Sequence, residues 1–308
     1  MATNEEILRA AELVRQGRLV AFPTETVYGL GANALDAAAV ERIYAAKGRP
    51  AGSPLIVHAA SLEQARELVA EWPAEADALA RRFWPGPLTL VLPKRACIPD
   101  RVTAGLPTVG LRVPSHPVAL ELIRLAGVPI AAPSANPFTR LSPTTAEHVR
   151  RGLGAVADAV LDGGAAAVGI ESTVLSLLPK PRLLRPGMIG AREIEEIIGP
   201  LQPAALASDA HPSPGMHPVH YSPATPLYLV RNGITAGGRV AAVWHRTPPS
   251  PGVARSVRLP DDPAEYAAAL YGTLHELDAE GFDAILVEAP PEDPAWAAIR
   301  DRLERASS

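Results

Sequence analysis

Polar and charged side chains recur in this sequence directly after short apolar runs. Thr24, Glu25 and Thr26 follow "RLVAF", and His58 ends "PLIVH". In open α/β sheets, ligands bind where strands end, so we expect such side chains to meet in one site. The others of this kind are Thr108, Arg112, Ser134, Asn136, Ser172, Thr173 and Arg185, and Lys47 and Arg49 in "KGRP" follow a predicted helix.

The chemistry of this set is cationic and rich in hydroxyl groups, and no sequence signature pairs a nucleophile with a histidine and a carboxylate. Fixed cations with many hydrogen-bond donors suit a substrate that carries phosphate and carboxylate groups. Structural interpretations stay open at this point. Lys47 and Arg49 could complement a helix dipole, and His58 could be a structural histidine.

Three further patterns are weaker. "YGLGANA" contains G-x-G, which we interpret as a glycine turn, but it has neither the phosphate-loop motif nor the full dinucleotide fingerprint. Glu25 and Glu171 could form a general acid–base pair, although their spacing does not show that they meet. His211, His217 and His220 resemble metal ligands, but their Pro/Gly setting without a nearby cysteine or carboxylate favours no metal site.

The composition predicts a cytoplasmic protein of two domains. The chain has 308 residues, 47% of them hydrophobic and 20% charged. Its single cysteine, Cys97, excludes a disulfide framework and fits a reducing compartment. The formal net charge of −4 gives no general attraction to nucleic acid. No apolar run is long enough to cross a bilayer, and the acidic, amphipathic N-terminus is unlike a signal peptide.

The first 200 residues mix predicted strands and helices without strict alternation. This predicts an α/β domain with a twisted, mixed, open sheet covered by helices. Apolar spacing predicts helices over 4–17, 36–48, 61–70, 73–83, 116–127, 144–154 and 191–199, with Asp36 and Gly48 bounding the second. Strands are predicted over 18–23, 53–58, 86–93, 108–114, 128–136, 155–164 and 171–178.

Residues 201–226 form a linker by composition, because they are dense in Pro, Ala and Ser and lack periodicity. Residues 227–308 then alternate strand and helix, which predicts a smaller, parallel, Rossmann-like α/β domain. Strands are predicted over 226–230, 238–245, 254–260 and 283–290, and helices over 262–282 and 294–306, with Asp261 or Asp262 as the cap of the first helix.

Nine motifs in order resemble the threonylcarbamoyl-AMP synthase family. They are "PTETVYGLG", "AKGRP", "PLIVH", "WPGPLTLVL", "VGLRVP", "APSAN", "ESTV", "LRPG" and "HYSPATP". The resemblance covers about residues 5–200 with a YrdC-like domain, and "HYSP" with the α/β tail resembles the long, two-domain form of the family. It implies that L-threonine, bicarbonate and ATP are condensed to threonylcarbamoyl-AMP and pyrophosphate. A separate transferase then uses this adenylate to modify the adenosine beside the anticodon of tRNA.

The resemblance also assigns the site. It implies Mg²⁺ carried on the phosphates rather than by protein side chains, and a lid role for Tyr221 over the nucleotide. The implied nucleotide contacts are Lys47, Arg49, Ser53, Thr108, Ser134, Ser142, Arg185 and Tyr221; the implied L-threonine contacts are Thr26, His58, Arg112, Ala132 and Ser172. Ser53 stands where many relatives have Asn, and a serine reaches less far toward a nucleotide.

Three other functions remain open in the sequence. An RNA-binding module would use the pairs Arg81–Arg82 and Arg150–Arg151, but the net charge and the lack of interleaved aromatic residues disfavour more than weak or indirect tRNA binding. A carbamoyltransferase of the hydrogenase-maturation type would need cysteine-rich fingers, which one cysteine cannot supply. The C-terminal domain could bind its own nucleotide, but it has no glycine fingerprint, so a scaffold role is favoured.

Overall fold

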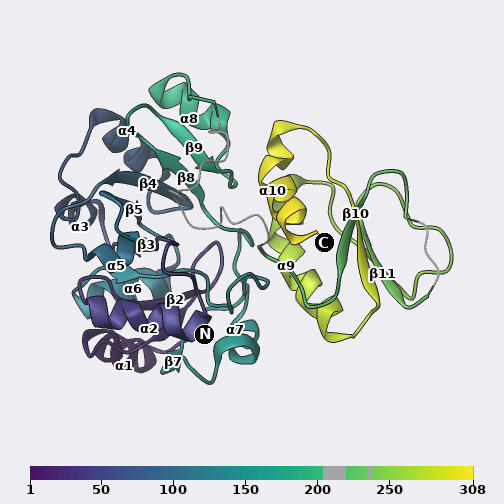
Figure 1. Cartoon of the computed structure of the whole chain (residues 1–308), viewed down its shortest axis with the longest axis horizontal. Coiled ribbons are helices and arrows are strands. Elements are labelled where there is room, and N and C mark those ends of the chain that lie inside the picture. Colours follow the sequence, from purple (N-terminus) through teal and green to yellow (C-terminus); the bar gives the residue numbers. More distant parts are fainter. Residues whose placement is uncertain (204–219, 235–237, 308) are drawn as a thin grey trace.

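The computed structural model describes residues 1–203, 220–234 and 238–307. These residues form two bodies, each built around its own sheet (Figure 1). The larger body contains a nine-stranded sheet and the smaller one a four-stranded sheet. No helix among these residues is both long enough and apolar enough to cross a membrane.

The large sheet is mixed, as the sequence predicts. Its strands run in the order β7-β1-β2-β6-β3-β5-β4-β8-β9, with β1 antiparallel to β2 and β3 parallel to β5. The strands are β1 Val20–Phe22, β2 Gly29–Asn33, β3 Ile56–His58, β4 Leu88–Pro93, β5 Thr108–Arg112, β6 Ile130–Ala131, β7 Ala159–Val160, β8 Thr173–Ser176 and β9 Arg182–Arg185. The helices are α1 Asn4–Arg15, α2 Ala37–Lys47, α3 Leu62–Glu67, α4 Ala74–Phe83, α5 Asp100–Thr103, α6 Pro117–Ala126, α7 Ala146–Leu153 and α8 Ala191–Ile198.

The caps of α2 fix where the site's first cations lie. The Asp36 side chain accepts hydrogen bonds from the backbone N–H groups of Ala38 and Ala39, and Gly48 ends the helix with φ 62°. A left-handed residue at this point suits glycine, which lacks a Cβ. The chain therefore turns between Lys47 and Arg49 and brings both cations to one helix end.

The segment after "PTETVY" is a strand, which corrects the prediction of a glycine turn. Gly29–Asn33 is β2, and its glycines are not among those with positive φ. A Cβ on Gly31 would lie 2.6 Å from atoms of both Phe22 and Ile130. Gly31 is thus needed for close packing inside the sheet, whereas Gly29 lines the cavity described below.

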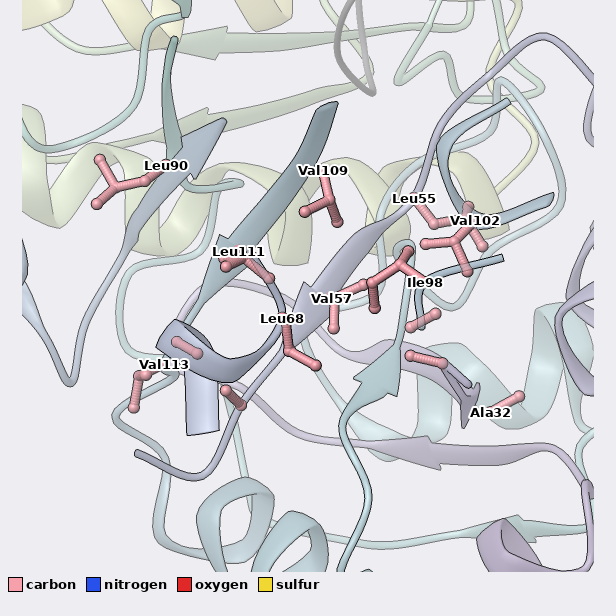
Figure 2. Packing of buried hydrophobic residues seen from close by; sticks show 14 of the residues in the cluster. Ala32, Leu55, Val57, Leu68, Leu90, Ile98, Val102, Val109, Leu111 and Val113 are labelled. Atoms are coloured by element: carbon pink, nitrogen blue, oxygen red, sulfur yellow. The ribbon is translucent and has the colours of Figure 1, made fainter. Parts of the chain in front are cut away.

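The core of the large domain lies under the middle strands of the sheet. Figure 2 shows Val57, Leu90 and Leu111 from three different strands packing with Leu55 and Ile98 from the loops. All five are at most 1% exposed. Burial of such side chains contributes about 1.5–3 kcal/mol each. This packed layer holds the strand ends that carry the site in fixed positions.

The smaller sheet is parallel throughout, with strand order β10-β13-β11-β12. Its strands are β10 Leu227–Val230, β11 Val240–Trp244, β12 Arg255–Arg258 and β13 Ala284–Glu288; its helices are α9 Pro263–Ala279, η1 Pro294–Trp296 and α10 Ala297–Ala306. Asp262 caps α9. Figure 1 shows α9 and α10 on the side of the small sheet that faces the large domain. Apolar residues of both domains share one cluster there, including Val27, Leu141 and Tyr271.

Candidate functional site

Most of the predicted site residues line one cavity at the strand ends of the large domain. Among its lining residues are Thr26, Arg49, His58, Arg112, Ala132, Ser134, Ser172, Arg185 and Tyr221. The cavity has a volume of about 50 Å³. Ligand pockets usually hold about 300–1,000 Å³, so the cavity in this conformation is too small for a nucleotide.

Lys47 and Arg49 are buried cations whose hydrogen bonds go to neutral oxygens. Lys47 Nζ donates to the carbonyl oxygen of Ser134 (2.5 Å) and to that of Asn136. Arg49 donates to the carbonyls of Ser53 (3.3 Å) and Pro54 (3.1 Å). Burial, reinforced by the Arg49 charge, lowers the pKa of Lys47 well below its ordinary value, and burial lowers that of Arg49 to about 10. Carbonyl dipoles do not cancel a full charge, so this part of the site favours an anion.

Arg185 holds the "GIEST" loop from the end of β9. Its Nε and one terminal nitrogen donate to the Ser172 carbonyl at 3.1 and 3.0 Å, and the latter also donates to Ser172 Oγ at 3.2 Å. Ser172 Oγ lies 2.8 Å from Thr89 Oγ1. Burial lowers the pKa of Arg185 from its ordinary value. The guanidinium therefore fixes Ser172 at the cavity wall.

Arg112 differs from these cations because it has an ionic partner. Its terminal nitrogen lies 2.8 Å from Glu25 Oε1, its Nε donates to the Gly86 carbonyl (3.2 Å), and its other terminal nitrogen donates to Thr26 Oγ1 (2.9 Å). Burial raises the pKa of Glu25, but the Arg112 charge and the hydrogen bonds to the carboxylate together outweigh burial and keep the pKa below its ordinary value. Glu25 is thus ionised at neutral pH, and Arg112 retains N–H groups for a ligand carboxylate.

His58 is neutral in this environment. It is 4% exposed at the end of β3, and its ring meets Phe22 edge-on with centroids 6.1 Å apart. Burial, with the nearby Arg112 charge, lowers its pKa to about 3. His58 can therefore accept or donate one hydrogen bond in the cavity but carries no charge at neutral pH.

Glu171 also lines the cavity and also pairs with an arginine. Its Oε2 accepts from Arg302 Nε at 2.7 Å and from the Tyr271 hydroxyl at 3.3 Å, both in the C-terminal domain. Its Oε1 accepts from Ser142 Oγ at 2.5 Å. Burial raises the pKa of Glu171, but the charges of Arg302 and Arg185 and the hydrogen bonds from Ser142 and Arg302 together outweigh burial and keep the pKa below its ordinary value. Because Glu25 and Glu171 are each ionised by an arginine, an acid–base pair is not supported.

The end of the interdomain segment forms part of the cavity wall. Residues 204–219 lie outside the described residues, so His211 and His217 are not placed. His220 and Tyr221 line the cavity, and Tyr221 has a positive φ of 63°. Ser222 N donates to the Thr139 carbonyl (2.9 Å), which anchors the returning chain on the large domain. A buried tyrosine held in this uncommon conformation indicates a constrained position.

Comparison with known proteins places this site in a family. A family model described as "Telomere recombination" (Sua5, YciO, YrdC) matches residues 12–187, and one described as "Threonylcarbamoyl-AMP synthase, C-terminal domain" matches residues 189–308. Threonylcarbamoyl-AMP synthases of Pyrococcus abyssi and Bacillus subtilis are 45% and 44% identical to the chain. The matches cover 97% and 100% of the chain and 93% and 94% of the relatives.

The chain belongs to the threonylcarbamoyl-AMP synthase family. A crystal structure of Pyrococcus abyssi Sua5 complexed with L-threonine matches the fold with a TM-score of 0.90 at 44% identity, covering 98% of the chain and 94% of that structure. The predicted family, enzyme class and fold class are therefore confirmed. The C-terminal match also disfavours the carbamoyltransferase alternative, which would require other appended segments.

Four of the residues that the family resemblance assigned to the nucleotide are not among the cavity's lining residues: Lys47, Ser53, Thr108 and Ser142. Lys47 lies beneath the wall and supports the "PSAN" loop. Ser142 is fully buried against Glu171, and Ser53 uses its carbonyl to accept from Tyr44 and Arg49. Thr108 begins β5 and is partly exposed. Their contacts with the nucleotide stay predictions.

Sequence reasoning missed apolar lining residues, namely Val27, Ile56 and Pro133. No sequence signal distinguishes them from core residues, because apolar side chains near strand ends serve both purposes.

The basic pairs proposed for RNA are largely neutralised. Arg81 binds Asp77 (2.7 Å), Arg150 lies 4.0 Å from Asp162, and Arg151 binds Glu147 (3.1 Å). This disfavours RNA binding as the main activity.

Proposed function

We propose that this chain condenses L-threonine, bicarbonate and ATP to threonylcarbamoyl-AMP and pyrophosphate. The observation that carries the proposal is one cavity with two kinds of buried cation. Arg49, supported by Lys47, bonds to neutral carbonyls, whereas Arg112 is balanced by Glu25. The first kind suits a polyphosphate with several charges, and the second suits the single carboxylate of an amino acid.

The nucleotide is assigned to the side of the cavity that holds Arg49, Ser134 and Arg185. Serine hydroxyl and backbone groups of the "PSAN" loop provide donors and acceptors, and the arginines provide charge. The carboxylate of L-threonine is assigned to Arg112. The hydroxyl and amino groups of the amino acid are assigned to positions near His58 and Thr26. Ser172 and Ala132 complete that side.

The chemical step requires positioning rather than acid–base catalysis. The threonine amino group attacks the carbon of bicarbonate, water is lost, and a carbamate forms. One oxygen of the carbamate attacks the α-phosphorus of ATP. The bond between the α-phosphorus and the bridging oxygen breaks, and pyrophosphate leaves with that electron pair. Arg49 and Arg185 would stabilise the charge that develops on the phosphoryl oxygens.

Mg²⁺ would come bound to the ATP phosphates. The described part of the chain contains no group of three His, Cys, Asp or Glu side chains that could hold a metal ion. Glu171, which lines the cavity, and Glu25, which pairs with the lining residue Arg112, are each engaged by an arginine. Mg²⁺ usually keeps several waters and binds substrate phosphates, which fits such a site.

Substrate entry requires the wall formed by His220 and Tyr221 to move. The 50 Å³ cavity cannot hold ATP while these side chains line it. Reclosure over bound substrates would exclude water from the mixed anhydride product, which hydrolyses readily. The product would then pass to a separate transferase acting on tRNA, in the cytoplasm.

The test is direct detection of the adenylate. Purified protein is incubated with ATP, Mg²⁺, L-threonine and ¹³C-bicarbonate. The products are separated by chromatography and their masses are measured by mass spectrometry. We expect a species with the mass of threonylcarbamoyl-AMP that carries the ¹³C label and disappears when threonine is omitted. An adenylate without the label, or none at all, would refute the proposal.

A further inference from the structure

An arginine of the C-terminal domain is held against the cavity wall. Arg302, in the last helix α10, is 0% exposed. Its Nε donates to Glu171 Oε2 at 2.7 Å and a terminal nitrogen donates to the Glu171 carbonyl at 3.3 Å. Glu171 lines the cavity of the large domain. One side chain of the C-terminal domain thus binds both the carboxylate and the backbone of a site residue.

Glu171 creates an electrostatic problem for the proposed substrate. An ionised carboxylate at the wall of a polyphosphate site repels the phosphates, and low-dielectric surroundings strengthen that repulsion. Ser142 and Tyr271 donate hydrogen bonds to Glu171 but bring no charge. Arg302 is a full positive charge in contact with the carboxylate. It also pairs with Asp301 at 2.5 Å, but Asp301 has a second arginine partner in Arg305, at 2.9 Å. The Arg302 charge can therefore offset the repulsion from Glu171.

The same arginine also contacts the end of the interdomain segment. The Arg302 guanidinium carbon lies 5.2 Å from the ring centroid of Tyr221. Tyr271 stacks on the Tyr221 ring, with the two ring centroids 6.1 Å apart. His220 N donates to the Arg305 carbonyl at 3.0 Å. The position of Tyr221 is therefore coupled to the helix that neutralises Glu171.

We propose that Arg302 is a positioning residue that sets the affinity of the site for ATP mainly by neutralising Glu171 and, to a lesser extent, by holding Tyr221. The proposal rests on the proposed function for the identity of the ligand. It gives the C-terminal domain a definite part in the site, beyond that of a scaffold. Arg302 acts through Glu171 and Tyr221 rather than on the reacting atoms.

The proposal differs from a purely structural ion pair between domains in one measurable way. If Arg302 only joined the domains, removing it would lower the thermal midpoint without a selective change in ATP affinity. If Arg302 offsets the charge of Glu171, removing that charge as well restores ATP affinity. A double-mutant cycle separates the two cases.

The experiment compares wild type with Arg302→Met, Arg302→Lys, Glu171→Gln and the double variant Arg302→Met/Glu171→Gln. Binding of a non-hydrolysable ATP analogue with Mg²⁺ is measured by calorimetry, and KM values for ATP and L-threonine are measured by pyrophosphate release. We expect Arg302→Met to weaken analogue binding at least about tenfold with less than about a twofold change in KM for threonine. Arg302→Lys should recover part of the loss, and the double variant should return to within about threefold of wild type.

Two control variants test for loss of folding or of domain contact. Arg255→Met removes ion pairs with Glu276 (3.7 Å) and Glu280 inside the C-terminal domain. His148→Ala removes a stacked contact between domains, with His275, whose ring centroid is 3.9 Å away. Both controls should keep wild-type analogue affinity.

Three results would overturn the proposal: a double variant no better than Arg302→Met, a Glu171→Gln variant that itself loses analogue binding, or a similar loss in His148→Ala. If Arg302→Met does not fold, the Glu171→Gln variant alone still tests the proposal, because the proposal requires that this variant bind the analogue at least as tightly as wild type. Failure of the proposed function is distinguishable from failure of this proposal. If only the proposed function fails, the wild type binds the analogue and the variants follow the expected order of affinities, but the wild type releases no pyrophosphate in response to threonine.

Discussion

The protein buries two arginine–glutamate pairs at one cavity, and they are built differently. Arg112 and Glu25 both belong to the large domain, and Thr26 and Gly86, which accept hydrogen bonds from Arg112, lie in loops of the same domain. Arg302 and Glu171 come from different domains. The first pair is complete once the large domain folds, whereas the second forms only when the domains dock. Under the proposed assignment of the two substrates, threonine recognition would depend on the large domain alone, whereas nucleotide recognition would depend on how the domains dock.

Removing the arginine of the local pair should have the largest effect. Arg112→Ala takes away the expected partner of the threonine carboxylate and leaves Glu25 as an unpaired buried charge. Truncating one partner of a buried charge pair costs about 2–5 kcal/mol, so we expect kcat/KM for threonine to fall about 100- to 1,000-fold. Steady-state pyrophosphate release measures it. Arg124→Ala, which removes an exposed ion pair with Glu121, is the control and should be unchanged; an active Arg112→Ala enzyme would disprove the threonine assignment.

Removing the charge of Glu25 while keeping its hydrogen bond to Arg112 should reduce activity less than removing Arg112. Glu25→Gln keeps the shape and a hydrogen-bond acceptor but removes the charge that orients Arg112. A charge-assisted hydrogen bond contributes about 1.5–3 kcal/mol, so we expect the KM for threonine to rise about tenfold or more. The affinity for the ATP analogue should stay the same, in contrast to Arg302→Met. Equal losses for both ligands would show that the two pairs are not functionally separate.

Acid should destabilise the fold through the histidine beside the local pair. His58 has a folded pKa of about 3 and an ordinary value of 6.5. Between these values only the unfolded chain binds this proton, so stability falls as the pH is lowered below about 6.5. The contribution is up to about 1.4 kcal/mol per pH unit.

Denaturant unfolding of wild type and His58→Gln from pH 7 to pH 5 measures this contribution. The variant should show a shallower loss of stability with acid, whatever its stability at pH 7. Below about pH 4.5, the lowered pKa values of Glu25 and Glu171 predict a further loss, since their ion pairs disappear as they protonate. Identical slopes for both proteins would contradict a buried neutral His58.

The smallest effect is expected outside both pairs. The side chain of Ser53 is not among the residues lining the cavity, and its carbonyl makes the contacts that hold Tyr44 and Arg49. Ser53→Ala keeps that carbonyl, so we expect less than about a threefold change in KM for ATP. Nucleotide titration measures it. A tenfold loss would show that the serine hydroxyl reaches the nucleotide after the cavity opens.

Much of the fold follows from local patterns, and the differences have local causes. The caps of α2 and α9 were predictable because capping depends on neighbouring residues. The strand β2 was not predictable, because two glycines in the sequence are typical of a turn. The structure shows that the side chains of Phe22 and Ile130 occupy the space next to Gly31. The short helix α5 and the strand β9 were also missed. Neither has enough residues to show a period.

The site was predictable only in part for a similar reason. Strand ends and motif order identified Arg49, Arg112 and Arg185. Nothing near Arg302 in "RDRLERA" marks it as different from the exposed arginines of an amphipathic helix. Its burial and its bond to Glu171, 131 positions away, arise from the docking of two domains. Contacts of this kind are set by tertiary structure and leave no local pattern.

The most direct test of the account is pyrophosphate release from ATP and Mg²⁺ with L-threonine and bicarbonate added singly and together. The account predicts release only when both are present, because the attacking group is the carbamate that they form. Release that proceeds without threonine would contradict it, since the Arg112 side of the cavity would then serve a different substrate.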